Sequence, residues 1–66
     1  MDVATLIVIA AHKSGGINEL AKRLGVGYNT VYSWKKGINK PKKMAIRCMC
    51  DMTDGIVTTD MMGITE

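Results

Sequence analysis

The segment from residue 17 to residue 37 constrains the fold more than any other part of the chain. Its first eight residues carry apolar side chains at the spacing of one face of an α-helix: Ile17, Leu20, Ala21 and Leu24. Gly25 then interrupts the pattern, at a place where helices often end in a left-handed backbone that glycine adopts without a side-chain penalty. A second helical period follows, with Val31 and Trp34 three residues apart, and it ends at Gly37. The segment therefore predicts two short helices joined by a three-residue turn.

These two helices and their turn resemble the helix-turn-helix of the Cro and cI-type phage repressors. Members of that family carry a small residue in the first helix, a turn glycine four residues later and a branched apolar residue six residues beyond it. Ala21, Gly25 and Val31 hold these places here. The other core positions of the motif are filled by Leu20, Leu24, Val26 and Trp34. The resemblance implies an all-α fold, a compact bundle of four to five helices that forms a single domain over residues 1–66.

The resemblance also implies that the second helix, at about residues 28–36, lies in the major groove of double-stranded DNA. The groove-facing, base-reading positions are then Gly27, Tyr28, Asn29, Tyr32 and Ser33. Asn29 can bind adenine through two hydrogen bonds, and Ser33 can donate or accept at several bases. Tyr28 and Tyr32 can contact a thymine methyl group, bind a phosphate through their hydroxyls, or pack partly into the core. Gly27 stands where relatives often carry a Ser, Thr or Asn cap. Glycine at this position weakens the helix by only a few tenths of a kcal/mol.

The charges of the chain are distributed unevenly. The formal net charge is +3, yet no Asp or Glu occurs between Leu20 and Cys50. That window carries eight of the nine basic residues: Lys22, Arg23, Lys35, Lys36, Lys40, Lys42, Lys43 and Arg47. Lysines near the C-terminal end of a helix also suit the helix dipole, so part of this run has a purely structural explanation. A surface with so many positive charges and no acid nevertheless favours an anionic partner, and nucleic acid is the best candidate.

Several side chains are expected to bind DNA phosphates in this arrangement. They are Asn18, at the N-terminus of the first motif helix, and Thr30, Lys35, Lys36, Asn39, Lys40, Lys42 and Lys43. A module of this size contacts few bases, and such modules gain specificity by pairing on two half-sites about 34–36 Å apart. The resemblance therefore implies a transcriptional repressor of the Cro type that binds a pseudo-palindromic operator, as a homodimer at least on DNA. An activator and an antitoxin-like regulator are the alternatives within this class.

Residues 2–13 predict a first helix, although their β-branched side chains would also permit a strand. Asp2 suits its N-terminal end and Lys13 its C-terminal end. One face is typical of a core: Val3, Leu6, Ile7 and Ala10. Three further apolar residues leave the helix almost without a polar side: Val8, Ile9 and Ala11. These surplus apolar side chains are either further core or a contact surface for a partner. The alternative to DNA binding is therefore a small helical protein-interaction module that uses residues 3–11.

The segment after Gly37 admits two interpretations. The favoured one is a loop over residues 37–41 and a helix that carries Pro41 in its first turn and runs to about Met52. Three side chains would stack along this helix, with two more beside them: Met44, Cys48 and Met52, then Ala45 and Met49. The other is a strand, and hence a C-terminal β-hairpin as in some Cro proteins, because apolar residues also alternate at Ile46, Cys48, Cys50 and Met52. Residues 56–62 predict a short additional helix capped by Thr58 or Thr59, with Asp60 in its first turn.

The remaining residue types argue against a catalytic or metal centre. Cys48 and Cys50 are the only cysteines, and their spacing is unsuited to a local disulfide, so reduced thiols are expected. His12 is the only histidine, which leaves no finger-like set of zinc ligands. No nucleophilic triad, carboxylate pair or phosphate loop accompanies the basic segment, so we expect no enzyme activity, cofactor, metal or small-molecule ligand. No signal peptide or membrane-spanning stretch is visible, and with the resemblance this predicts a cytoplasmic protein of a bacterial cell, encoded by a phage or prophage.

Overall fold

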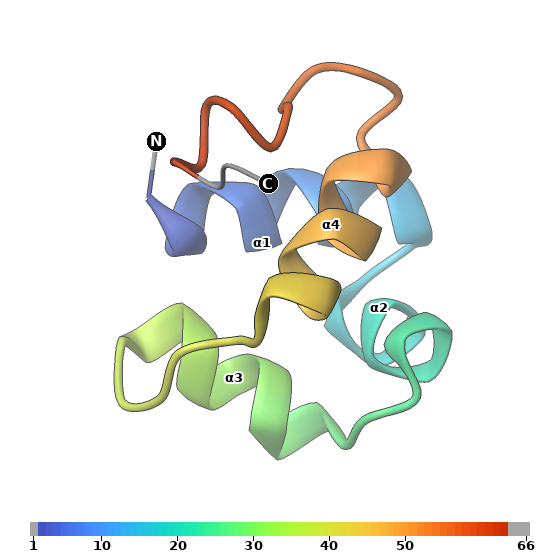
Figure 1. Cartoon of the computed structure of the whole chain (residues 1–66). Helices are drawn as coiled ribbons and strands as arrows, with labels where there is room; N and C mark the ends of the chain where they lie inside the picture. Colours follow the sequence, from blue (N-terminus) through green and yellow to red (C-terminus); the bar gives the residue numbers. More distant parts are fainter. Residues whose placement is uncertain (1, 64–66) are drawn as a thin grey trace.

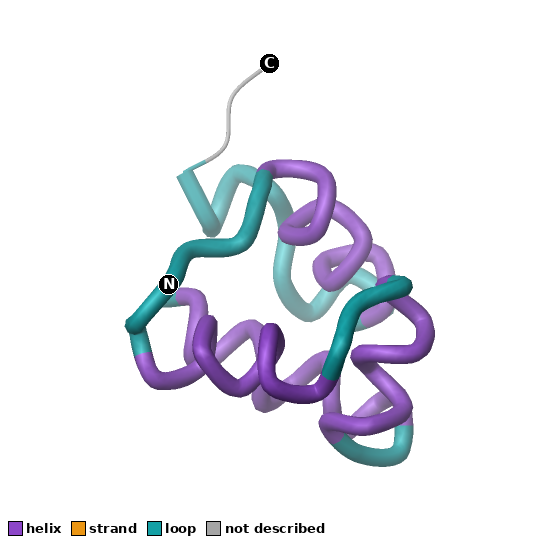
Figure 2. The backbone as a smooth tube through the Cα atoms, turned by 90° about the horizontal axis from the view of Figure 1, so that it is seen from below, coloured by secondary structure: helices purple, strands orange, loops and turns teal. Residues whose placement is uncertain are grey.

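The computed structural model describes residues 2–63 and contains four helices, shown in Figure 1. They are α1 (Val3–Ser14), α2 (Ile17–Leu24), α3 (Tyr28–Lys36) and α4 (Lys43–Met52). Within these residues the helices are joined by loops and turns alone, without a strand (Figure 2). The predicted all-α bundle is therefore confirmed, and the β-hairpin variant is wrong for the described part of the chain.

Helix α1 is the central element, since it packs against α2, α3 and α4. Asp2 caps its N-terminus by accepting a hydrogen bond of 2.8 Å from the backbone N–H of Thr5. The helix ends at Gly15, which has a left-handed backbone with a φ of 100°. Four side chains of α1 are buried in the core: Leu6, Ile7, Ala10 and Ala11. Of the three surplus apolar residues, Ala11 is therefore buried, Ile9 is half-buried against the core and Val8 is exposed.

Helices α2 and α3 form the predicted pair, and the chain turns between them at residues 25–27. Gly25 ends α2 with a φ of 73°, and the backbone N–H of Val26 donates to the carbonyl oxygen of Ala21 over 3.0 Å. Four of the predicted core side chains are buried: Leu20, Ala21, Val31 and Trp34. Leu24 and Val26 are half-buried and pack against them. These contacts fix α3 so that its opposite side faces solvent.

Helix α4 begins later than predicted and buries only part of its apolar side chains. Pro41 lies before the helix and is buried, and Lys42 is the N-cap residue. The buried side chains of α4 are Met49 and Cys50, whereas the Met44 side chain is 71% exposed. Met and Cys occur on several sides of this helix, so their apolar character alone did not identify the side that packs on α1. Of the three side chains expected to stack along this helix, Met44 and Cys48 are exposed and Met52 is half-buried against the core.

The residues after α4 form turns in place of the predicted helix at 56–62. Thr53 is buried, and its hydroxyl accepts a hydrogen bond of 3.0 Å from the backbone N–H of Val57. Asp54 and Gly55 both have positive φ angles, of 55° and 87°, which reverse the chain so that Val57 enters the core. Thr58 does accept a hydrogen bond from the N–H of Met61, but only a single turn follows. The segment thus buries Val57 and forms turns where a helix was predicted.

Candidate nucleic-acid interface

The solvent-facing side of α3 carries most of the side chains predicted to read bases. Val31 and Trp34 point into the core and thereby fix the orientation of the helix. Tyr28, Asn29 and Tyr32 are exposed on the helix, as is Thr30, and Gly27 precedes them as the N-cap residue with an extended backbone. No side chain caps the N-terminus of α3. Polar and aromatic groups of the first two turns are therefore accessible to a partner.

Tyr28, Tyr32 and Lys36 form a row along α3 at intervals of four residues. The two tyrosine rings stack with their centroids 6.1 Å apart and their planes inclined by 13°. The Lys36 ammonium lies 5.4 Å from the centroid of the Tyr32 ring, which is the geometry of a cation–π contact. The Tyr28 side chain is 45% exposed and that of Tyr32 is 39% exposed, so neither belongs to the core. These mutual contacts were not predicted, although the four-residue spacing of the three residues could have indicated them.

Ser33 differs from the other predicted base-reading residues because its hydroxyl is engaged within the protein. It donates a hydrogen bond of 2.7 Å to the carbonyl oxygen of Thr30 and accepts one of 3.3 Å from the Asn39 amide. The backbone N–H groups of Ile38 and Asn39 also donate to the carbonyl oxygen of Ser33. Ser33 and Asn39 therefore hold the loop after α3 against the helix, in addition to any contact with a partner.

The lysines predicted to bind phosphates gather at the C-terminal end of α3 and in the following loop. We call this group the basic surface; it comprises Lys35, Lys36, Lys40, Lys42 and Lys43, all of them exposed. Ion pairs join Lys13 to Asp54 over 3.9 Å and Lys22 to Glu19 over 3.6 Å. The lysines of the basic surface form no ion pair with an acid of residues 2–63. Figure 1 shows α3 at one end of the molecule and the segment with Asp54 and Asp60 at the other. The positive charge is thus spatially separated from those two acids.

Asn18 is exposed in the first turn of α2, where a backbone N–H group without a partner could meet a phosphate. Gly16 occupies the N-cap position with a φ of 131°, and no side chain hydrogen-bonds to this end of the helix. Neither the Asn18 nor the Ser14 side chain caps this helix. The structure places Asn18 on the helix that precedes α3 in the motif, with its side chain accessible.

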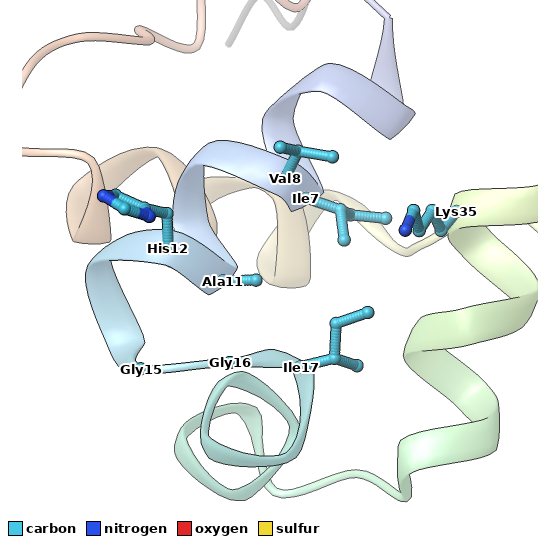
Figure 3. A pocket seen from close by; sticks show the side chains of 8 residues that line it. All are labelled: Ile7, Val8, Ala11, His12, Gly15, Gly16, Ile17 and Lys35. Carbon is cyan, nitrogen blue, oxygen red and sulfur yellow. The ribbon is translucent and has the colours of Figure 1, made fainter.

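Two hollows lie beside α3, and lysines line both of them. One, of about 440 Å³, lies between α1, the start of α2 and α3, and Figure 3 shows Lys35 extending across it toward Ile7. The other, of about 460 Å³, lies between the α2–α3 turn and α4, and both Lys40 and Lys42 line it. Lys35 therefore lies on the α1 side of α3, whereas Lys36 lies over the Tyr32 ring.

The two cysteine thiols have different environments. Cys48 is exposed, whereas Cys50 is buried, and this burial raises the pKa of the Cys50 thiol above its ordinary value, with a further contribution from Asp51. In the described part of the chain no three His, Cys, Asp or Glu side chains cluster as metal ligands.

No helix among residues 2–63 combines the length and the apolar character needed to cross a membrane. Comparison with family models, with curated proteins and with solved structures found no match to this chain.

Proposed function

We propose that the chain binds double-stranded DNA in a sequence-specific manner, with α3 in the major groove. The observation that carries this proposal is the continuity between the exposed side of α3 and the basic surface. The first presents hydrogen-bonding and aromatic side chains to a groove. The second presents to the flanking phosphates lysines that form no ion pair with an acid of residues 2–63. This is the division between base reading and backbone positioning that a DNA-binding helix requires.

We further propose that two copies bind together on one operator and that the protein acts as a transcriptional repressor of the Cro type. The Cα atoms of one molecule extend over 27 × 24 × 18 Å, which is less than the roughly 34–36 Å between the centres of two half-sites. One copy therefore reads one half-site, and a pseudo-palindromic site needs a second copy. An activator or an antitoxin-like regulator would make the same contacts with DNA. Measuring transcription from a promoter that overlaps the selected site separates these roles from repression.

The alternative of a protein-interaction module has less support from the geometry of α1. Of its apolar residues, Leu6, Ile7, Ala10 and Ala11 are buried, and Val3 and Ile9 are half-buried against the core. Val8 is the large apolar side chain of this helix that remains mostly exposed, at 53%. One valine is a small surface for a stable protein contact, which usually buries about 800 Å² per partner.

The test is selection of a preferred duplex from random sequences, followed by binding measurements on variants over a range of salt concentrations. We expect Asn29→Ala to lower affinity by about 1–3 kcal/mol and to relax the preference at one base pair. Lys40→Ala should weaken binding to all duplexes and reduce the slope of log K against log salt by about one. Lys13→Ala is the matched control, because it removes the same charge outside the basic surface, where Lys13 pairs with Asp54.

Two results would contradict the proposal. If no duplex were enriched over random DNA, sequence-specific binding would be excluded, and a protein partner would become the better candidate. If a duplex were enriched but Asn29→Ala left both affinity and preference unchanged, α3 would not be the reading helix. Sedimentation of the protein with and without the selected duplex measures the number of copies bound.

A further inference from the structure

The row of Tyr28, Tyr32 and Lys36 restricts how each ring can meet a partner. The centroid of the Tyr32 ring lies 6.1 Å from that of Tyr28 and 5.4 Å from the Lys36 ammonium, so these neighbours cover part of the ring, which stays 39% exposed. The rings are nearly parallel, at 13°, so one face of Tyr28 is directed toward Tyr32 as well. A base that stacked on Tyr32 would therefore compete with these two neighbours. The edges of the rings, and the exposed side of Tyr28, remain for contact.

Ring edges are suited to apolar groups of DNA. The edge of an aromatic ring carries partial positive charge and apolar C–H groups, while the negative charge lies on the faces. In the major groove the C5-methyl group of thymine is the apolar feature of the base pairs, and apolar side chains contact it there. Within the described residues neither tyrosine hydroxyl has an intramolecular hydrogen-bond partner, so the hydroxyls can remain hydrated while the ring edges touch methyl groups.

The order of the three residues along α3 matches the way such a helix enters DNA. The N-terminal residues of a helix-turn-helix reading helix lie over base edges, which places Tyr28, in the first turn, above a base pair. Lys36 is in the last turn, among the lysines of the basic surface that flank the groove. Tyr32 lies between them and touches both. The row thus links a base contact at one end to a phosphate contact at the other.

We propose that Tyr28 recognises the C5-methyl group of thymine and that Tyr32, supported by Lys36, is the positioning residue that holds the Tyr28 ring for this contact. This inference rests on the proposed DNA binding, and it names the chemical group that the aromatic part of the interface selects. It assigns the two tyrosines different roles: Tyr28 makes the contact, and Tyr32 acts through Tyr28. It also couples specificity to a lysine that itself contacts no base.

The experiment compares the selected duplex with duplexes in which single thymines are replaced by uracil, which removes the methyl group and leaves base pairing intact. At the thymine that Tyr28 contacts, we expect uracil to reduce affinity about fourfold, the effect of losing one buried apolar carbon. Tyr28→Phe should retain this thymine preference because the ring is unchanged, and Tyr28→Ala should abolish it. Tyr32→Ala should reduce the preference although Tyr32 does not touch the methyl group, and Tyr32→Phe should restore it.

Lys35 and Lys36 provide a matched pair of controls, since they are adjacent lysines and only Lys36 lies over the Tyr32 ring. Both Lys35→Ala and Lys36→Ala should lower the salt slope by about one, but only Lys36→Ala should reduce the preference for thymine. The inference is overturned if no uracil replacement changes affinity, if the site contains no thymine, or if Tyr28→Ala keeps the preference. In each of these cases the effect of Asn29→Ala still reports separately on whether α3 reads DNA at all.

Discussion

Asp2 shows how a single side chain fixes the start of α1. Hydrogen bonds from Thr5, through its side chain and its backbone N–H, lower the pKa of the Asp2 carboxyl below its ordinary value of 3.8. The folded state therefore binds this proton less readily than the unfolded state does. The resulting stabilisation is present above the ordinary pKa and is lost as the pH falls through the lower, folded-state pKa.

Asp2→Asn should separate the cap from its charge. Asparagine is as good an N-cap as aspartate, but it does not titrate and lacks the favourable interaction of a negative charge with the helix N-terminus. We expect the melting temperature of the variant to be slightly lower than that of the wild type at pH 7. This difference in melting temperature should disappear as the pH falls below about 4. Circular dichroism melting curves between pH 2.5 and pH 7 measure this difference. A gap that stayed constant over the whole range would show that Asp2 does not act as a charged cap.

Comparison of the four helices shows how much of the fold the sequence could predict. In α2 and α3, apolar Leu20, Val31 and Trp34 alternate with charged and polar residues, so the buried face followed directly from spacing. In α4, Met44 and Met49 are chemically alike, and only packing against α1 decides that Met49 is buried and Met44 exposed. A hydropathy pattern predicts a face only when the two sides of a helix differ in polarity.

The candidate site shows the same limit at the level of contacts. The sequence located the exposed residues of α3, because burial of Val31 and Trp34 leaves the other side to solvent. It did not reveal that the Ser33 hydroxyl binds Thr30 and Asn39, or that Lys36 lies over Tyr32. The Ser33 contacts depend on the path of the loop after α3, which helical periodicity does not encode, whereas the four-residue spacing of Tyr32 and Lys36 could have indicated their contact.

The two methionines of α4 provide a direct test of its orientation. Met49→Ala removes a fully buried side chain and should lower the free energy of unfolding by about 2–5 kcal/mol. Met44→Ala makes the same chemical change at a position that is 71% exposed and should alter it by less than about 0.5 kcal/mol. Urea denaturation followed by circular dichroism gives both values. Equal losses for the two variants would mean that α4 is rotated relative to the packing described above.

At the scale of the whole molecule, the segment after α4 covers the end of the bundle that lies away from α3 (Figure 1). Val57 from this segment joins a core otherwise built by the four helices, and Thr53 is the residue that connects the two parts. The path of the segment could not be predicted from the sequence, because its Thr, Asp and Gly residues suit turns and helix caps equally well. The buried hydroxyl of Thr53 decides between these possibilities by binding the backbone of Val57.

Thr53→Val should therefore release the segment from the bundle while keeping the shape of the buried side chain. The hydroxyl lies 2.7 Å from the carbonyl oxygen of Cys50 and accepts from the N–H of Val57, so valine leaves that buried N–H without an acceptor. We expect a loss of about 1–3 kcal/mol in the free energy of unfolding and faster hydrogen exchange at the Val57 amide. Thr53→Ser is the control, because it keeps the hydroxyl and loses one methyl group, at about 0.8 kcal/mol. Its Val57 amide should stay protected, and equal exchange rates in the two variants would show that packing of the methyl group, rather than the hydrogen bond, holds this segment in place.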